Sequence, residues 1–523
     1  MSSSNSRKKQ RTTRSSVPAL GAPSEADEQS NDFNNPTSSA SSSRVLPTTT
    51  IPSLSTLCAR RFAASYKKIR ENEFLWKATA QYLKLAPDSM IPKILAMLVT
   101  TCPTFLDHAV IVTYFLRGPL ISLDMNKLPG VKESTILQIP RLNPSLREVE
   151  LTKFGKISDE KFASVFSRLT ELRRVVLRDC TKVGLKTVVA IAKSCPHLKI
   201  ANLNHTSSPP AAVGDLLLSC PQLEVLKLAG ISNWTDGTFS KLAKALDKKT
   251  RFVSLRTLKL RMLSLSDNNL NFMVSLFPNL RRLDLSFTPA RHLLILSSPE
   301  SPDLEKISLT STQVTSSDLL AIIARLPCLK TLSLGALGVR ESSKATVSNS
   351  SAMTMNDYTL REMTAILTNF QDLESVSLVA NTKLCINTKA DSAVLEFVQQ
   401  VGRRCKYLNL SGIPSIRSND LVGLIAEVQH YTPPALERLL LNQTGVDDGA
   451  SASICSCRNL VNLGLSGTRF TSVASDEGLF PILDACTRLE HLDLTSCRGV
   501  PVGDRRRFFQ VWEGERNPQY SVH

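Results

Sequence analysis

The sequence predicts an α/β fold: a curved solenoid of repeated strand-plus-helix units, with parallel strands on its concave face and helices on its convex face. The first observation is a unit of the form Leu-x-x-Leu-x-Leu, with conservative replacements, which occurs fourteen times. The second is the spacing of these copies, whose last residues are mostly 24 to 26 positions apart. The third is that amphipathic helical stretches follow the copies, such as residues 162–166 and 319–323. A fixed period of this length predicts a leucine-rich-repeat horseshoe.

Within each copy, one residue separates the last two apolar positions. On a strand both therefore point into the core, and the residue between them points to the concave face. A single unit cannot bury its own leucines, so stability must come from stacked neighbours. The copies are Leu120/Leu123/Met125, Leu146/Val149/Leu151, Leu172/Val175/Leu177, Leu198/Ala201/Leu203, Leu223/Leu226/Leu228, Leu255/Leu258/Leu260, Leu280/Leu283/Leu285, Leu304/Ile307/Leu309, Leu329/Leu332/Leu334, Leu373/Val376/Leu378, the weaker Leu408/Leu410, Leu436/Leu439/Leu441, Leu460/Leu463/Leu465 and Leu489/Leu492/Leu494.

We expect four consecutive segments along the chain. Residues 1–50 are rich in Ser, Thr, Asn and Pro and poor in apolar residues, which predicts a disordered tail. Residues 51–117 are apolar and helical in pattern, which predicts a helical capping segment before the repeats. Residues 118–500 form the repeat array, interrupted by a Ser-rich insertion loop at 335–369, and residues 501–523 are expected to be a C-terminal tail.

The tail contains a short basic cluster, Arg7, Lys8, Lys9 and Arg11. Such a cluster is typical of a nuclear import signal, although a plain solvated tail explains it as well. We therefore expect the protein in the nucleus, the cytoplasm or both. The chain has no run of 18 or more apolar residues, which predicts no membrane span, and no apolar segment of signal-peptide type at its polar N-terminus.

The formal net charge is +17, and residues 1–50 contribute only +2 of it. The remaining +15 lies in the segment expected to fold, which favours acidic partners, either protein or nucleic acid.

Twelve cysteines and seven histidines are scattered along the chain and form no catalytic or metal-binding motif. Cys455 and Cys457, the closest pair, lack the second pair that a structural zinc site needs. No Gly-rich phosphate loop is present either. We therefore expect packed thiols in a reducing compartment, no cofactor, no metal and no enzymatic activity.

Several cysteines stand at recurring positions of the repeat. Cys195 and Cys220 begin Cys-Pro-x-Leu before a copy, and Cys180 and Cys497 follow a copy. In this respect residues 118–500 resemble the cysteine-containing, RNI-like repeats of F-box/LRR proteins, and are similar to the repeats in the LRR subunit of a fungal nucleotide-excision-repair ubiquitin ligase. The resemblance implies a non-catalytic substrate receptor, with DNA repair as one setting.

The segment before the array resembles a BC-box, the helix by which substrate receptors bind elongin C. Ser53, Leu54 and Cys58 match its pattern, and Phe62 departs from it because the box prefers a smaller aliphatic residue there. The resemblance implies that these residues lie in an adaptor's hydrophobic groove, with Leu54 as the anchor. It also implies a downstream cullin-contacting segment, which Ile91 and Pro92 fit.

Two alternatives remain for this segment. One is an ordinary cap that covers the exposed core of the first repeat. The other is an F-box that binds a Skp1-like adaptor, although the pair Leu46-Pro47 is not followed by a convincing F-box pattern. The sequence thus favours the substrate-recognition subunit of a cullin–RING ubiquitin ligase that is linked through an elongin-C-like or Skp1-like adaptor. The alternative is an LRR interaction scaffold with no link to a ligase.

The concave face of the early repeats is predicted to be basic, with few acidic residues apart from Glu148, Glu150 and Asp284. Later repeats are neutral at the same positions. We expect this face to bind an acidic protein substrate, or with less support nucleic acid, while a merely solvated charged surface is the alternative. The predicted substrate-binding cations are Arg174, Arg178, Lys227, Lys259, Arg261, Arg282 and Lys306.

Overall fold

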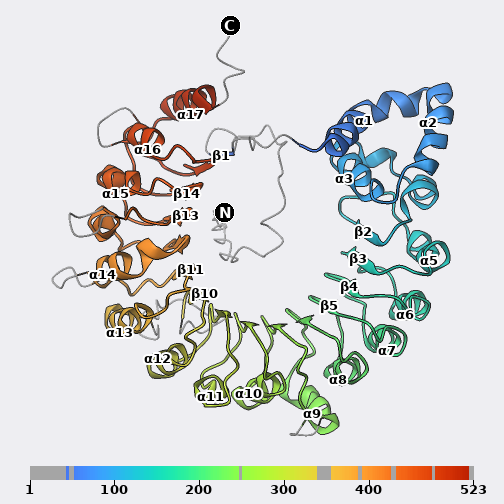
Figure 1. Ribbon diagram of the computed structural model, residues 1–523, viewed down its shortest axis with the longest axis horizontal. Helices are drawn as coiled ribbons and strands as arrows, with labels where there is room; N and C mark the ends of the chain where they lie inside the picture. The colour runs from blue at the N-terminus through green and yellow to red at the C-terminus, as the bar shows by residue number, and fades with distance from the viewer. Residues whose placement is uncertain are drawn as a thin grey trace, which may run out of the picture. The chain divides into compact units, whose positions relative to one another are not determined.

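Parallel strands line the inner side of a curved array, and helices cover its outer side (Figure 1). This arrangement confirms the predicted leucine-rich-repeat solenoid. The basic cluster at residues 7–11 lies outside the part of the chain that the structure describes. The computed structural model describes residues 43–45, 52–246, 250–337, 355–386, 392–425, 432–473 and 478–516.

One sheet runs through the array. Fourteen strands, β2 to β15, are parallel and follow one another in chain order, and each coincides with a predicted copy of the unit. The strands are β2 (Leu120–Asp124), β3 (Glu148–Thr152), β4 (Arg174–Val176), β5 (Ile200–Asn202), β6 (Val225–Lys227), β7 (Thr257–Lys259), β8 (Arg282–Asp284), β9 (Lys306–Ser308), β10 (Thr331–Ser333), β11 (Ser375–Ser377), β12 (Tyr407–Asn409), β13 (Arg438–Leu440), β14 (Asn462–Gly464) and β15 (His491–Asp493).

The first copy has a different register from the predicted one. In β2, Ile121 pairs with Val149 of β3 and Leu123 pairs with Leu151, and both β2 residues are buried. The core positions are therefore Ile121 and Leu123, not Leu123 and Met125. An alternating pattern fits either choice, because a shift by two residues keeps every side chain on the same face. Only the pairing with β3 decides the register.

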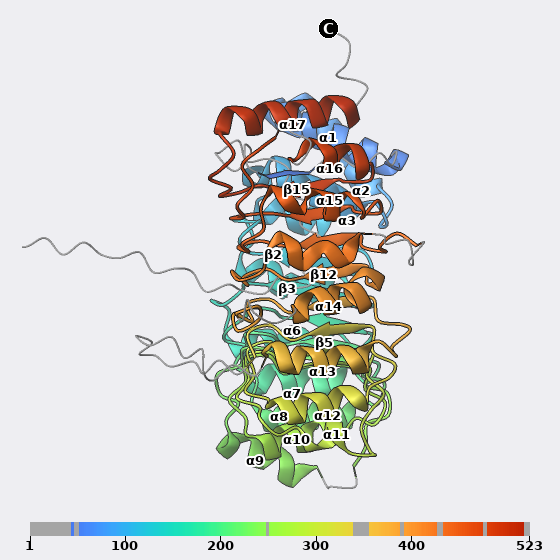
Figure 2. The same cartoon turned by 90° about the vertical axis from the view of Figure 1, so that its left-hand side faces the viewer.

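Helices follow the strands and stack side by side along the outer surface (Figure 2). Their buried faces carry aliphatic and aromatic residues at helical spacing, as the amphipathic stretches predicted. They are α5 (Glu133–Leu142), α6 (Asp159–Phe166), α7 (Leu185–Ser194), α8 (Pro210–Ser219), α9 (Asp236–Ala245), α10 (Asp267–Ser275), α11 (Leu294–Ser297), α12 (Ser316–Ala324), α13 (Asp357–Leu367), α14 (Ala393–Gln400), α15 (Ser451–Cys455) and α16 (Phe480–Ala485), with a 3₁₀ segment η6 (Ser418–Leu424) between α14 and α15.

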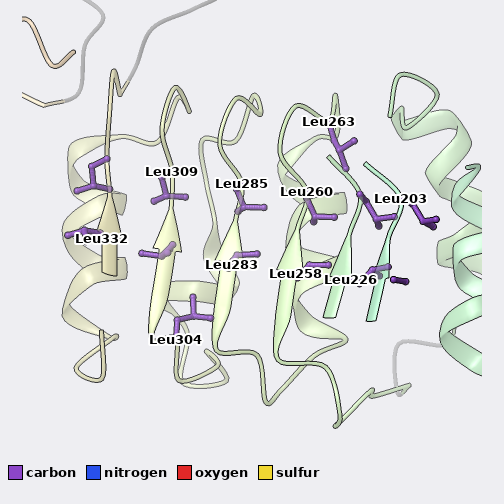
Figure 3. Close-up of a cluster of buried hydrophobic side chains, with 14 of the residues drawn as sticks. Leu203, Leu226, Leu258, Leu260, Leu263, Leu283, Leu285, Leu304, Leu309 and Leu332 are labelled. Atoms are coloured by element: carbon purple, nitrogen blue, oxygen red, sulfur yellow. The ribbon is translucent and has the colours of Figure 1, made fainter. Parts of the chain in front are cut away.

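The core is a ladder of leucines that continues from one repeat to the next (Figure 3). Leu226, Leu258 and Leu283 stand opposite one another on β6, β7 and β8, and none is more than 1% exposed. Burying one leucine stabilises a fold by about 1.5–3 kcal/mol relative to leaving it in water. Because each leucine is covered by the repeats on either side, the stability of the array depends on these contacts between neighbours.

Each strand from β3 to β15 ends in a similar turn. The residue two positions after the last core leucine has a positive φ, for example 67° at Lys153 and 55° at His205. The N–H of His205 donates to the carbonyl of Ala229 in the next repeat, at 2.8 Å. Gly230 takes the same position one repeat later, and a Cβ there would come within 2.3 Å of the His205 ring. The turn therefore joins adjacent repeats by hydrogen bonds as well as by packing.

Helices cover both ends of the array. Before β2, the predicted cap consists of α1 (Leu54–Glu71), α2 (Glu73–Leu85) and α3 (Ile91–Thr101), followed by short helical turns up to Phe115. After β15, α17 (Val502–Arg516) buries Phe508, Phe509 and Trp512. Most of the expected C-terminal tail is thus a helix, because these aromatic side chains cover the last repeat.

Two further findings concern segments outside the regular repeats. A short strand, β1 (Ser43–Val45), pairs antiparallel with β15, so part of the predicted tail belongs to the sheet. The expected insertion loop at 335–369 contains α13, which is the regular helix of its repeat. Residues 338–354 lie outside the described residues.

Candidate functional site

The first helix of the cap, α1, presents apolar side chains to solvent. Leu54 is 76% exposed, and Leu57 and Cys58 are exposed beside it. The opposite face of the helix is buried through Ala59 and Tyr66. At about 100° per residue, Leu54, Leu57 and Cys58 share one side of the helix. Leu54 and Cys58, two of the five predicted adaptor-binding residues, therefore lie together on an accessible surface.

Phe62, the remaining helical residue of the predicted box, points differently. It lies about 80° around the helix from Leu54 and is half-buried. Its ring packs edge-on against Tyr66, with the ring centroids 5.6 Å apart. Burial raises the pKa of Tyr66 to about 12, as expected for a ring inside the cap. Phe62 thus contributes to the cap core as well as to the rim of the exposed surface.

The start of α3 supports the start of α1. Lys93 Nζ donates a hydrogen bond of 2.8 Å to Ser55 Oγ in the first turn of α1. Ile91, predicted to contact a cullin, is buried inside the cap, and Pro92 is half-buried. Both residues line a cavity of about 390 Å³ between the cap and the first two strands, together with Leu95, Phe115, Asp124, Glu150 and Arg178.

The second helix, α2, carries an apolar surface that the sequence interpretation missed. Phe74, Tyr82 and Leu85 are each at least 75% exposed. The available signal was that α2 has six large apolar side chains in 13 residues, more than one buried stripe needs. Among them, Trp76 packs on the cap, where the guanidinium of Arg70 lies 4.2 Å from its ring.

Strand pairing arranges the concave face in columns. The column before the central core leucine reads Glu148, Arg174, Ile200, Val225, Thr257, Arg282 and Lys306 from β3 to β9. The column after it reads Glu150, Val176, Asn202, Lys227, Lys259, Asp284 and Ser308. Arg178 and Arg261 lie just beyond the ends of β4 and β7. The seven predicted cations therefore belong to one continuous stretch of the inner surface.

Acidic residues neutralise part of this basic stretch. Arg174 lies 3.9 Å from both Glu148 and Glu150, and Arg178 lies 3.6 Å from Asp179. Asp284 has a structural role, because its carboxylate accepts the N–H of Ser286 at 3.0 Å. Arg282, by contrast, is exposed and makes no ion pair within the described residues.

Two aliphatic side chains interrupt the cations. Ile200 and Val225 are neighbours in the first column, on β5 and β6, and both are half-buried. We call these two residues the apolar window. They occupy the same position in the repeat as Arg174 and Arg282. Reading every residue at this position from the sequence would therefore have revealed the apolar window. The interpretation selected only the cations of the column and missed these two residues.

The concave face changes character after β9. Its first and second columns there are mostly Ser, Thr, Asn and Tyr, and the charged exceptions are Arg438 on β13 and Asp493 on β15. His491 on β15 has a pKa lowered by burial, so it is neutral at physiological pH. The cations predicted to bind substrate thus all lie in the first half of the array.

Within the described ranges, no group of three or more His, Cys, Asp and Glu side chains is arranged to hold a metal ion. The helices of the same ranges are all too short or too polar to cross a lipid bilayer.

No protein-family model matches the chain, and no curated protein sequence matches it. Solved structures with a similar fold include yeast Rad7 in its complex with Elc1, at 17% identity and a TM-score of 0.45, over 82% of this chain and 96% of that one. The internalin InlF from Listeria monocytogenes is similar at 16% identity and a TM-score of 0.36, over 64% and 89%. TLR13, crystallised with a single-stranded RNA, is similar at 19% and 0.37, over 67% and 43%. No statement about a partner of this chain follows from likenesses this distant.

Proposed function

We propose that this protein is the substrate-binding subunit of a cullin–RING ubiquitin ligase. In this proposal the exposed side of α1 binds an elongin-C-like adaptor, and the concave face of β3–β9 binds the substrate. The chain itself catalyses nothing: it holds a substrate near enzymes that other subunits supply.

The observation that carries the proposal is the exposure of Leu54 at the start of α1. A leucine that a cap uses only to cover the first repeat would be buried, as Ala59 and Tyr66 are. Leu54 and Leu57 instead add apolar surface in water beside Cys58. An amphipathic helix with such a stripe is suited to a hydrophobic groove on a partner.

The described contacts also explain why α1 would hold its shape before a partner arrives. Its buried side packs on α3, and the Lys93–Ser55 hydrogen bond fixes the first turn. A preorganised anchor loses little conformational entropy on binding. Phe62 is turned partly into the cap, so in this proposal Leu54, Leu57 and Cys58 supply the contact.

The test compares Leu54→Ala/Cys58→Ala with wild type in the full chain, by titration against purified elongin-C-like and Skp1-like adaptors. Loss of a central leucine anchor should cost about 2–4 kcal/mol, or roughly 30- to 700-fold in Kd. The matched control is Leu294→Ala/Cys328→Ala. Leu294 is also the first residue of a helix, α11, and is 66% exposed, and Cys328 is also exposed. The control should bind like wild type.

The outcomes separate the candidate functions. Binding to the elongin-C-like adaptor that the double variant loses supports the proposal. Binding only to the Skp1-like adaptor would keep the ligase link but show that the adaptor is of the Skp1 class, not the elongin C class. If wild type binds neither adaptor, the chain is a repeat scaffold without a ligase link, and the exposed side of α1 serves another partner.

A further inference from the structure

The apolar window lies between two basic positions in a single column. From β4 to β9 this column reads Arg174, Ile200, Val225, Thr257, Arg282 and Lys306, and the strand pairing fixes that order. Charge is therefore placed at both ends of a short aliphatic stretch. Ile200 and Val225 are adjacent and half-exposed, so this column has an apolar centre between its basic ends.

The distance between the basic ends defines a length. Neighbouring strands lie about 4.8 Å apart, so four steps from β4 to β8 separate the backbones of Arg174 and Arg282 by roughly 19 Å. An extended peptide advances about 3.3 Å per residue, so six residues span the same distance. A peptide that crosses the strands would thus place side chains about six positions apart at Arg174 and Arg282.

The two ends are able to accept acidic groups. Arg282 is exposed and has no ion pair within the described residues. The contacts of Arg174 with Glu148 and Glu150 are long, at 3.9 Å each, and a ligand carboxylate can compete with them. In the next column Lys227 lies beside Val225, and Lys259 follows on β7 beside Thr257, so cationic residues continue past the apolar window.

A nucleic acid fits this pattern less well than a peptide. Duplex DNA carries about one negative charge per 1.7 Å of its axis, which requires cations without interruption. Here Glu148, Glu150 and Asp284 share the surface with the cations, and the centre is aliphatic. A peptide with acidic residues on both sides of an apolar side chain matches this surface better, because its acidic residues would meet the basic ends and its apolar side chain would meet the apolar window.

We infer that the concave face of β4–β9 binds an extended peptide that lies across the strands, with an aliphatic side chain on Ile200 and Val225 and acidic residues about six positions apart at Arg174 and at Arg282. This inference rests on the proposed function, because it names the class of substrate segment that the receptor takes.

The test uses the full chain and a fluorescent peptide, Asp-Glu-Gly-Ser-Leu-Ser-Gly-Glu-Asp, whose binding is followed by anisotropy. Replacing its central Leu by Ser should weaken binding by about tenfold, because one aliphatic contact is lost. Removing two residues between the acidic pairs should weaken it by a similar factor, since both ends can no longer be reached. Higher salt should weaken binding of each peptide, because exposed charge pairs are screened over about 8 Å at physiological ionic strength.

Protein variants then assign the contacts. Arg282→Glu should lower affinity for the peptide by at least tenfold. Arg438→Glu is its matched control, because Arg438 is also exposed and occupies the same column on β13. Ile200→Ser/Val225→Ser should lower affinity for the Leu peptide but not for the Ser peptide. Thermal unfolding of each variant identifies any that fail to fold. If Ile200→Ser/Val225→Ser fails to fold, Arg282→Glu still tests the inference, because it changes an exposed residue.

Three outcomes overturn the inference. One is equal binding of the Leu and Ser peptides, and another is equal effects of Arg282→Glu and Arg438→Glu. The third is tighter binding of a 15-base-pair DNA duplex than of the peptide, with the binding of DNA dependent on Arg174 and Arg282. That result would make the face a nucleic-acid surface. Adaptor binding is measured on the same samples. If it persists while the peptide fails, only this inference falls; if the adaptor fails while the peptide binds, only the ligase link falls.

Discussion

The cap and the repeat array use the same kinds of apolar residue in opposite ways. Between residues 54 and 85 the cap leaves six large apolar side chains exposed: Leu54, Leu57, Phe74, Leu75, Tyr82 and Leu85. In the array, exposed large apolar side chains are scattered over helices and loops, and the leucines of the repeated unit after Leu120 are buried. Exposed apolar side chains gathered on two neighbouring helices, α1 and α2, mark a binding site more readily than a defect of folding.

The largest expected effect is on the free energy of unfolding, when one carboxylate is placed in the array and, in a second variant, one in the cap. Leu283→Asp buries a carboxylate without a partner in the centre of the array, and should lower the free energy of unfolding by more than about 4 kcal/mol. Leu54→Asp should change it by less than about 0.5 kcal/mol, because Leu54 is already in water.

Chemical denaturation and hydrogen exchange measure both variants. Because repeats are stabilised by their neighbours, Leu283→Asp should increase exchange first in β7, β8 and β9 and then in more distant repeats. Unchanged exchange in β7 and β9 would contradict the stacked arrangement. A large loss of stability in Leu54→Asp would mean that the Leu54 side of α1 packs against the rest of the protein.

Thiols give the next largest contrast. Burial raises the pKa of Cys180, Cys195 and Cys405 to about 12, whereas Cys58 on α1 is exposed. In the unfolded chain these thiols lose protons near pH 8.5. Their stabilising contribution is therefore complete below that pH and is lost as pH rises toward 12, by up to about 1.4 kcal/mol per thiol and pH unit. Unfolding temperature should fall steadily above pH 9.

Labelling with a thiol reagent at pH 8 measures the same contrast residue by residue. Cys58 and Cys328 should react quickly in the native protein, and the buried thiols of the array only on unfolding. In a Cys328→Ser background, the adaptor should protect Cys58. Fast reaction of Cys180 in the native protein would show that the array opens locally far more than its burial implies.

The smallest effect should come from α2. Phe74→Ser/Leu85→Ser removes two side chains that are at least 80% exposed, so the free energy of unfolding should change by less than about 1 kcal/mol. Binding of a hydrophobic dye should decrease, because exposed apolar area is removed. A destabilisation above about 2 kcal/mol would show that these side chains pack inside the protein in solution.

The array was predictable because its signal is repeated. One doubtful copy, such as Leu408/Leu410, is placed correctly by its neighbours. The two ends of the array were less predictable, because the sequence pattern of each end occurs once and is not repeated. The register of β2 depends on pairing with β3, and α17 is a helix because Phe508 and Trp512 find an uncovered repeat to pack against. For the site, the cations were found from their charge, but the apolar window was visible only once strand pairing placed its two residues between them.

The short strand β1 has a consequence for how the chain is made. Ser43 pairs with Asp493, 450 positions later, and Arg44 forms an ion pair of 2.8 Å with Glu513 of α17. Most other contacts of the array join neighbouring repeats and can form as synthesis proceeds. At about 5–20 residues per second, β1 waits on the order of 20–90 seconds for its partner strand. The first strand to be synthesised is therefore the last to enter the sheet, and its pairing marks a chain whose final repeat is complete.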